Sequence, residues 1–304
     1  MKKFSIESKL ELSKILEKIE VEFGKKSVAN ILDNFHKKSL GHVLGITGPP
    51  GVGKSSIINK LISTFRKKGL SVGVLAIDPS SLRSGGALLG DRARLEIDPT
   101  DSKIFMRSLA AKDFLGGVSE LTYPFMIVLR SIFDIVIIET VGVGQSEISI
   151  ENIADTVIYC VQPGSGDTLQ FMKSGIIEIP DIILVTKSDL EQLSNITVSD
   201  LVSSKSYIKN NLNWEIEVIP VSSHKNIGFE KLENIISDRW KWLNNNGTLI
   251  KKRISQDIEW MKKSIVNQYG TKGITLIKSK IGQVKDPFIS LLELKKNMIL
   301  TFKK

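Results

Sequence analysis

The sequence has only one cysteine, Cys160, in 304 residues, so it cannot contain an internal disulfide. It also has no apolar run near the ~18 residues that a membrane-spanning helix requires. Its first 20 residues mix glutamates with lysines and hold no long apolar segment of the kind found in secretory signals. These absences argue against a secreted, disulfide-stabilised or membrane-spanning protein, and we expect a cytoplasmic location.

Positive charge is concentrated near the C-terminus. Residues Lys251–Lys304 hold thirteen Lys/Arg against four Asp/Glu, which accounts for the whole net charge of +9. Such a segment can meet nucleic acid, a membrane surface or an acidic protein, or it can be a solvated helical face. Zinc-ligand spacing, RGG repeats and interleaved aromatic and basic residues are all missing, so nothing favours a nucleic acid. We expect neither a nucleic acid nor a membrane as partner.

Short apolar runs alternate with helical patterns through the middle of the chain. The expected strands are 43–47, 72–77, 135–139, 156–161, 182–186 and 217–221. The expected helices between them include 55–68, 119–131, 167–179 and 228–244. Runs that are apolar on both faces are typical of a parallel sheet covered by helices. The pattern therefore predicts a doubly wound α/β domain with a mostly parallel sheet.

Helical spacing of apolar residues marks both ends of the chain. Residues 1–40 predict a helical N-terminal extension, 41–246 the nucleotide-binding domain, and 247–304 a helical C-terminal arm. Pro287 is placed to open the second helix of the arm. Because so short an arm cannot form its own core, we expect it to pack on the main domain or on a second subunit.

Histidines and tryptophans show no pattern of a ligand site. His36, His42 and His224 lack metal-ligand spacing, and we expect them at the surface or at helix caps. Trp240, Trp242 and Trp260 are expected to pack between helices.

The segment after the first expected strand matches the phosphate-binding pattern GxxxxGK[ST]. It comprises Gly48, Pro49, Pro50, Gly51, Val52, Gly53, Lys54 and Ser55, followed by Ser56, and it opens an expected helix. Glycines let backbone N–H groups face phosphate oxygens, and the helix N-terminus favours negative charge. We expect Lys54 to reach the β- and γ-phosphates and Ser55 to bind Mg²⁺, as in P-loop nucleotide hydrolases.

Carboxylates at strand ends are the candidate metal ligands. Glu139 ends the run IVIIE and is followed by Gly142, whose N–H is a candidate γ-phosphate donor. Asp78 ends another strand, although an aspartate before Pro79 is equally typical of a turn. Asp91 follows a glycine-rich stretch and is a further candidate metal or water ligand.

Hydrolysis itself has few candidate side chains. Arg92 and Arg94 either offset phosphate charge or lie on a solvated face. We expect in-line attack of water on the γ-phosphate with Lys54 and Mg²⁺ stabilising the charge, aided by Glu139 and Asp91.

Thr186, Lys187, Ser188 and Asp189 match the pattern [NT]KxD after an expected strand. The Asp189 carboxylate can accept N–H bonds from guanine N1 and the exocyclic 2-amine, whereas adenine offers no such pair of donors. Lys187 is expected to lie along the base, and Ser222 with Ser223 one strand later to approach guanine O6. The nucleotide predicted by this pattern is GTP or GDP.

Together these motifs resemble the MeaB/ArgK/MMAA family of SIMIBI-class P-loop GTPases. Four strings typical of that family occur in order: AIDPSSLRSGGALLGDRAR at 76–94, FMRSLAAKDFLGGV at 105–118, ETVGVGQSE at 139–147 and GDTLQFMKSGIIEI at 166–179. The resemblance runs through nearly the whole of 41–246, whereas the arm shows only helical spacing. One departure is Thr186, which stands where the family usually has an asparagine whose amide tethers the P-loop.

The resemblance implies GTP hydrolysis coupled to chaperoning of an adenosylcobalamin-dependent mutase, usually methylmalonyl-CoA mutase. It implies gated cobalamin loading, Mg²⁺ as cofactor, a homodimer formed through the arm, and a partner-facing switch at Asp167, Gln170 and Lys173. Two other functions stay open: a nucleotide-gated binding module, and the lysine/arginine/ornithine transport kinase that an older family name suggests. The kinase would need an acceptor pocket, for which no motif is found.

Overall fold

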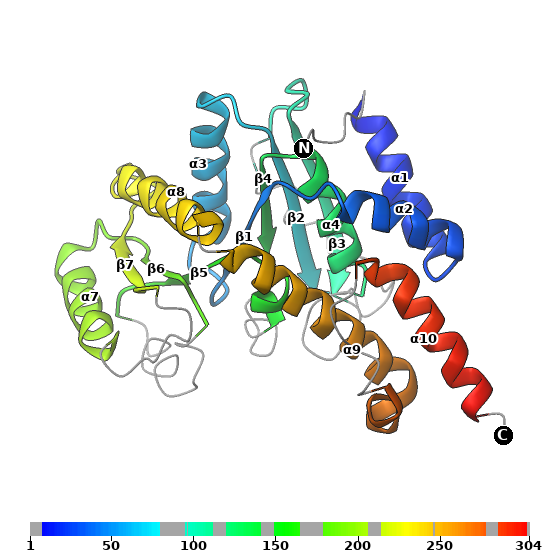
Figure 1. Cartoon of the computed structure of the whole chain (residues 1–304). Helices are drawn as coiled ribbons and strands as arrows, with labels where there is room; N and C mark the ends of the chain where they lie inside the picture. Colours follow the sequence, from blue (N-terminus) through cyan, green and yellow to red (C-terminus); the bar gives the residue numbers. More distant parts are fainter. Residues whose placement is uncertain are drawn as a thin grey trace.

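The computed structural model describes residues 8–79, 95, 97–111, 120–140, 149–164, 179–205, 214–245, 247–277 and 285–302 (Figure 1). Its strands are β1 (His42–Thr47), β2 (Val72–Pro79), β3 (Ile104–Ala111), β4 (Ile135–Glu139), β5 (Thr156–Val161), β6 (Ile182–Val185) and β7 (Glu217–Pro220). Its helices are α1 (Lys9–Glu22), α2 (Lys26–His36), α3 (Lys54–Lys67), α4 (Thr122–Ile132), α7 (Glu191–Lys205), α8 (Phe229–Asn245), α9 (Thr248–Ile277) and α10 (Pro287–Phe302), with a short 3₁₀ helix η2 (Ile150–Asn152).

The strands form one parallel sheet in the order β3-β2-β4-β1-β5-β6-β7. Strand β1 is central, and the chain builds outward from it in both directions. In such sheets ligands bind outside the carboxyl ends of the strands, where the strand order reverses. That position lies at the end of β1, between β4 and β5. The doubly wound parallel sheet predicted from the sequence is confirmed.

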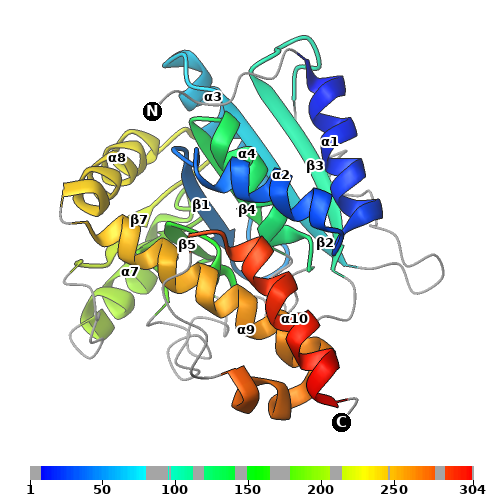
Figure 2. The same cartoon turned by 45° about the vertical axis from the view of Figure 1, so that its right-hand side comes forward.

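Alternate residues of each strand face opposite helical layers, as the two-residue period of a strand requires. Leu44 and Ile46 of β1 join the core beneath α3 and α8, and Val43 joins the core beneath α2, α4, α9 and α10. Figures 1 and 2 show these two groups of helices against the sheet. Because both faces are covered, the inner strands are buried along their length and mostly apolar, which is why the sequence revealed them.

The N-terminal helices and the C-terminal arm form one packed layer. Trp260 and Met261 of α9 and Phe288 of α10 share a buried cluster with Leu32 of α2. Asp33 of α2, itself buried, accepts the backbone N–H groups of Phe288 and Ile289 at 3.1 and 3.0 Å and so caps α10. The arm therefore packs on the main domain and the N-terminal helices, which is the first of the two arrangements expected for it.

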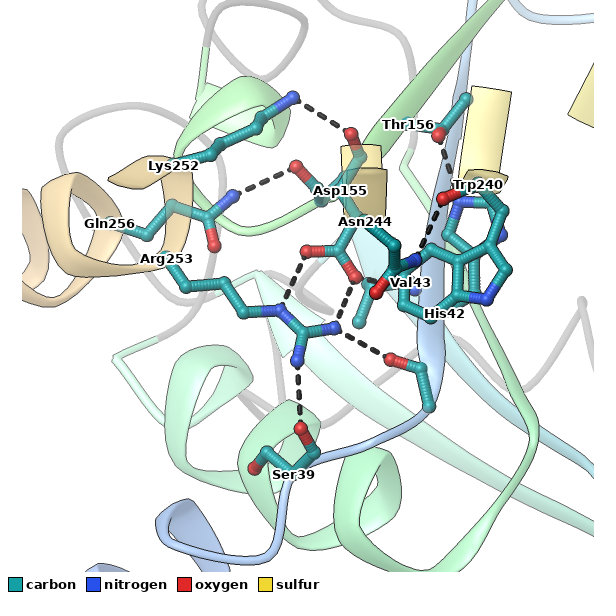
Figure 3. Close-up of polar contacts among 12 residues, drawn as sticks. Ser39, His42, Val43, Asp155, Thr156, Trp240, Asn244, Lys252, Arg253 and Gln256 are labelled. Carbon is teal, nitrogen blue, oxygen red and sulfur yellow. Dashed lines mark hydrogen bonds and ion pairs between the residues drawn. The ribbon is translucent and has the colours of Figure 1, made fainter. Parts of the chain in front are cut away.

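Arg253 of α9 fastens the arm to the end of the sheet remote from the P-loop (Figure 3). Its Nε and Nη2 donate to the two carboxylate oxygens of Asp155 at 3.0 and 2.7 Å. The guanidinium also donates to the carbonyls of Ser39 and Gly41, both at 2.7 Å. Asp155 in turn accepts the N–H of Val43 in β1 at 2.9 Å. One side chain thus joins the arm, the segment before β1 and the segment before β5.

Asp155 is completely buried, so its charge depends on this partner. Burial alone would raise the pKa of the Asp155 carboxyl, but the charge and hydrogen bonds of Arg253 hold it well below the ordinary value. Lys252 and Gln256 donate to the carbonyls of Asp155 and Ala154 at 2.9 and 2.8 Å (Figure 3). The second and third turns of α9 are therefore bound through polar contacts rather than through apolar packing alone.

The histidine expectations are partly wrong. His42 is buried in β1, stacks on Trp240 and bonds Thr156 Oγ1 at 2.8 Å (Figure 3), and burial lowers its pKa to about 3. His36 is half-buried, with its Nε2 3.0 Å from Asp257 Oδ1 of α9, whereas His224 is exposed as expected. A histidine at the start of a strand is expected to be exposed because it is polar, but Trp240 of α8 covers this one.

Trp260 packs between helices, which confirms the expectation for it, whereas Trp240 and Trp242 contact aromatic residues that lie outside helices. Trp260 stacks on Tyr123 of α4 with ring centroids 5.1 Å apart, and Trp242 meets Trp214 edge-on at 5.7 Å. The hydroxyl of Tyr123 donates to the same Asp257 that pairs with His36. Helix α9 is thereby joined to both α2 and α4.

Three other local expectations differ from the structure. The N-terminal extension is two helices rather than one, because Gly24 adopts φ 94° and ends the first. Strand β3 lies at the sheet edge and mixes Arg107 and Ser108 with apolar residues, so it lacks a continuous apolar run. Helix α7 was not predicted, since apolar Leu193 and Ile196 are exposed on it. Most of the helix expected over 167–179 lies outside the described residues.

No helix in the described part of the chain combines the length and apolarity that a bilayer crossing demands.

Candidate nucleotide site

The loop between β1 and α3 is shaped by glycines in conformations that other residues avoid. Gly48, Gly51 and Gly53 have φ of 138°, 75° and 101°. At Gly48 an added Cβ would lie 2.2 Å from the carbonyl oxygen of Cys160 in β5, so the loop begins in direct contact with that strand. Burial raises the pKa of the Cys160 thiol to about 12, which keeps it neutral beneath the loop.

Replacing Gly48 by alanine should lower the free energy of unfolding by ~2–3 kcal/mol, because φ and the Cys160 contact both oppose a side chain. Gly51→Ala is the matched control. Its φ is also positive, but nothing lies within 4 Å of the added carbon, so ~1 kcal/mol is expected. Urea unfolding of both variants measures the difference, and equal losses would contradict the close approach at Gly48.

Lys54 begins α3 and bends back over the loop. Its ammonium donates to the carbonyls of Gly48 at 2.7 Å and Pro49 at 3.0 Å, and the residue is 8% exposed. The N-terminus of α3 directs backbone N–H groups into the same concavity, which favours an anion. Val52 is buried in the core below the loop, and Ser56 is exposed on the first turn of α3.

Ser55 and Glu139 meet at the strand ends. Ser55 Oγ donates to Glu139 Oε1 at 3.2 Å, although the residues are 84 positions apart. Glu139 ends β4 and pairs in register with Ile46 of β1, one residue before β1 ends. The carboxylate is 4% exposed. These two predicted metal ligands are therefore brought together.

The other predicted metal and switch residues are less fully described. Asp78 lies near the end of β2, two positions beyond Ala76. Because Ala76 pairs with Glu139, the backbone of Asp78 lies at the same carboxyl end of the sheet as Glu139. Its side chain lies outside the described part of the structure. Also outside it are the expected site residues Asp91, Arg92, Arg94, Gly142, Asp167, Gln170 and Lys173.

The TKSD segment follows β6 directly and is fixed to two neighbours. Thr186 donates from both its N–H and its hydroxyl to the carbonyl of Val161 in β5, at 2.8 and 3.0 Å. Lys187 has φ 51°, and its ammonium donates to Gln162 Oε1 at 2.7 Å and to the P-loop carbonyl of Gly51 at 3.2 Å. The segment is therefore linked directly to the phosphate-binding loop.

Asp189 is held as an ionised acceptor. The hydroxyl of Ser222, in the bridge after β7, donates to Asp189 Oδ1 at 2.6 Å. This hydrogen bond is the main reason that the pKa of the Asp189 carboxyl lies below its ordinary value. Ser222 is buried, while Ser223 is half-buried in the following turn. A charged carboxylate beside that turn can accept the N–H edge of a purine.

The described site residues thus gather at the carboxyl ends of β1, β4, β5, β6 and the bridge after β7. Sequence reasoning missed Gln162, which contacts Lys187. The signal that could have found it is its place directly after a buried strand, the same argument that marked Asp78 and Glu139.

A family model described as "Methylmalonyl Co-A mutase-associated GTPase MeaB" matches residues 12–275 of the chain. The chain belongs to the MeaB family. The match covers the N-terminal helices, the whole sheet and most of α9, so the resemblance seen in the sequence is confirmed, and the chain is a P-loop GTPase.

Relatives of this MeaB family member include a protein of Pyrococcus horikoshii described as a GTPase, 41% identical over 73% of the chain and 71% of that protein. The Escherichia coli GTPase ArgK is 33% identical over 72% of the chain and 68% of its own length. A Caenorhabditis elegans protein named methylmalonic aciduria type A homolog, mitochondrial, is 34% identical over 75% of the chain and 58% of its own length.

Among solved structures, one titled LAO/AO transport system kinase superposes with a TM-score of 0.68 over 95% of the chain and 93% of its own. Its sequence identity is 23%, so the likeness concerns the fold. It confirms the fold, a doubly wound parallel sheet with flanking helices.

Proposed function

We propose that GTP binds across the P-loop and the TKSD segment and that its hydrolysis drives a chaperone cycle on a cobalamin-dependent mutase. The observation that supports one continuous site is the hydrogen bond from Lys187 to Gly51, because it joins the TKSD segment to the P-loop. In this proposal Lys54 and the loop amides bind the phosphates, and Gly142 senses the third one.

Mg²⁺ fits the residues present. A hydroxyl and a carboxylate lie 3.2 Å apart beside the loop, and both are oxygen ligands of the kind that Mg²⁺ takes together with substrate phosphates. Ser55 and Glu139 would hold it, with Asp78 and Asp91 as further candidates. When bound, it offsets charge that develops on the phosphate oxygens. Lys54 adds its charge on the same side, and the buried setting strengthens that effect.

Asp189→Asn should lower GDP affinity by ~100-fold or more, because an amide cannot accept both N–H groups of the guanine edge and leaves polar groups unpaired. The same variant should gain affinity for xanthosine diphosphate, whose 2-oxo group accepts a hydrogen bond. Fluorescence titration with GDP and with xanthosine diphosphate measures both changes in affinity. Since the pKa of Asp189 lies below its ordinary value, wild-type affinity should stay constant as pH falls from 8 to about 5. Unchanged GDP binding by the variant would remove Asp189 from the base site.

The mutase role is proposed from the family to which the chain belongs. The matched family model is described as mutase-associated, and relatives carry the methylmalonic aciduria name. We propose a methylmalonyl-CoA mutase as client, a cytoplasmic location, and a homodimer formed through the arm of residues 247–304. The switch at Asp167, Gln170 and Lys173 is proposed to face the client.

The decisive test uses the purified chain with the cobalamin-dependent mutase of the same cell. Mutase activity is followed during prolonged turnover with GTP, GDP or a non-hydrolysable GTP analogue. We expect GTP to slow inactivation of the mutase and to change uptake of adenosylcobalamin. Protection by the analogue alone would favour a nucleotide-gated binding module. No complex and no effect with any nucleotide, or phosphate transfer from labelled GTP to a periplasmic binding protein, would overturn the proposal.

A further inference from the structure

The side chain of Thr186 is hydrogen-bonded to β5. Its hydroxyl donates to the carbonyl of Val161, which already accepts the N–H of the same residue. A threonine has one hydroxyl proton to donate, and here it goes to β5. The direct link between the TKSD segment and the P-loop runs instead through Lys187, whose ammonium is 3.2 Å from the carbonyl of Gly51.

Lys187 has a second and shorter contact. Its ammonium is 2.7 Å from Oε1 of Gln162, a distance typical of a charge-assisted hydrogen bond. A lysine has four flexible side-chain bonds, and one 3.2 Å contact at the surface holds such a chain weakly. The carboxamide of Gln162 therefore fixes where the ammonium, and the stem below it, lie.

Strand order explains why this residue can act on both loops. Strand β5 lies between β1, which leads into the P-loop, and β6, which leads into TKSD (Figure 1). Gln162 is the first residue after β5, so its side chain starts between the two loops. The residue is half-buried, which leaves its carboxamide room to turn toward Lys187.

We propose that Gln162 is a positioning residue for guanine-nucleotide binding, which holds Lys187 across the P-loop where the side chain of Thr186 does not. Gln162 acts through Lys187 and does not itself contact the nucleotide. The inference rests on the proposed function, because the proposed function is what puts the guanine base beside Lys187 and Asp189.

The test compares GDP affinity of four proteins by fluorescence titration: wild type, Gln162→Leu, Lys187→Met and the double variant. Leucine keeps most of the side-chain volume and removes the acceptor. We expect Gln162→Leu to weaken GDP binding by about 5-fold or more, a modest figure because the contact is at the surface. In the Lys187→Met background the same change should have less than a 2-fold effect, because its partner is already gone.

Gln192→Leu is the matched control, since Gln192 is an exposed glutamine in the first turn of α7. It should bind GDP like the wild type. Equal affinity of Gln162→Leu and Gln192→Leu would overturn the inference and leave the proposed function intact. Independent losses from Gln162→Leu and Lys187→Met would also overturn it, because Gln162 would then act by another route. Failure of the wild type and of Gln192→Leu to bind GDP would instead remove the proposed function.

Discussion

Lys54→Ala should lower GTP turnover by ~100- to 1,000-fold, the loss typical of removing one preorganised charge or donor from a transition state. The ammonium is buried at the start of α3 and is held over the loop by the carbonyls of Gly48 and Pro49. Alanine removes both the charge and these two contacts. Release of inorganic phosphate at saturating GTP, measured with and without mutase, gives the effect.

Lys67→Ala is the control for this experiment, because Lys67 is exposed near the end of the same helix. It removes one positive charge from α3 but leaves the loop untouched, so its turnover should equal that of the wild type. Equal rates for Lys54→Ala and the wild type would contradict P-loop catalysis at this site.

Arg253→Met should lower the free energy of unfolding by ~3–5 kcal/mol, because it leaves the charge of Asp155 buried without a partner. Asp155 has no exposed surface, and Arg253 supplies two of its hydrogen bonds as well as its countercharge. Methionine keeps the apolar stem of the arginine, so the loss reports the guanidinium. Urea unfolding at pH 7, analysed for the change in midpoint and slope, measures it.

The control is Lys251→Met, which removes an exposed charge two residues earlier on α9 and should cost less than ~0.5 kcal/mol. The pH dependence of the difference in unfolding free energy between wild type and Arg253→Met provides a second check. The pKa of Asp155 is depressed in the folded wild type, so its contribution is complete above the unfolded pKa of ~3.9 and declines as pH falls below it. The gap between wild type and Arg253→Met should therefore narrow as the pH is lowered below about 4. A constant gap would show that lost packing, and not the buried charge, causes the destabilisation.

The inner sheet could be predicted because burial on both faces forces an apolar run, as in Val43–Ile46 and in β4. The same argument fails at the sheet edge, where Arg107 of β3 reaches out to Glu20 on α1 and breaks the run. It also fails for His42, which is buried against Trp240 and Thr156, both more than 100 positions away. Contacts that distant leave no local pattern in the sequence.

The residues of the candidate site also fall into those that a local sequence pattern predicts and those that depend on distant contacts. Lys54, Ser55 and Asp189 lie in short motifs whose chemistry is set by consecutive residues, so the sequence alone could predict them. Ser55 in the first turn of α3 and Glu139 at the end of β4 were both predicted as metal ligands, and the structure brings them together. Gln162 escaped because its contact with Lys187 depends on β5 lying between β1 and β6, and strand order is a property of the whole sheet.

The cap that Asp33 places on α10 has a consequence for how the molecule is made. Asp33 and the amides it accepts are 255 and 256 positions apart, so α2 leaves the ribosome long before its partner exists. Until then Asp33 and the part of α2 that packs on α10 remain uncovered. The central sheet can assemble during synthesis, but the outer helical layer closes only when the last helix arrives. Loss of α10 would thus leave the first segment of the chain, as well as the last, without its final packing.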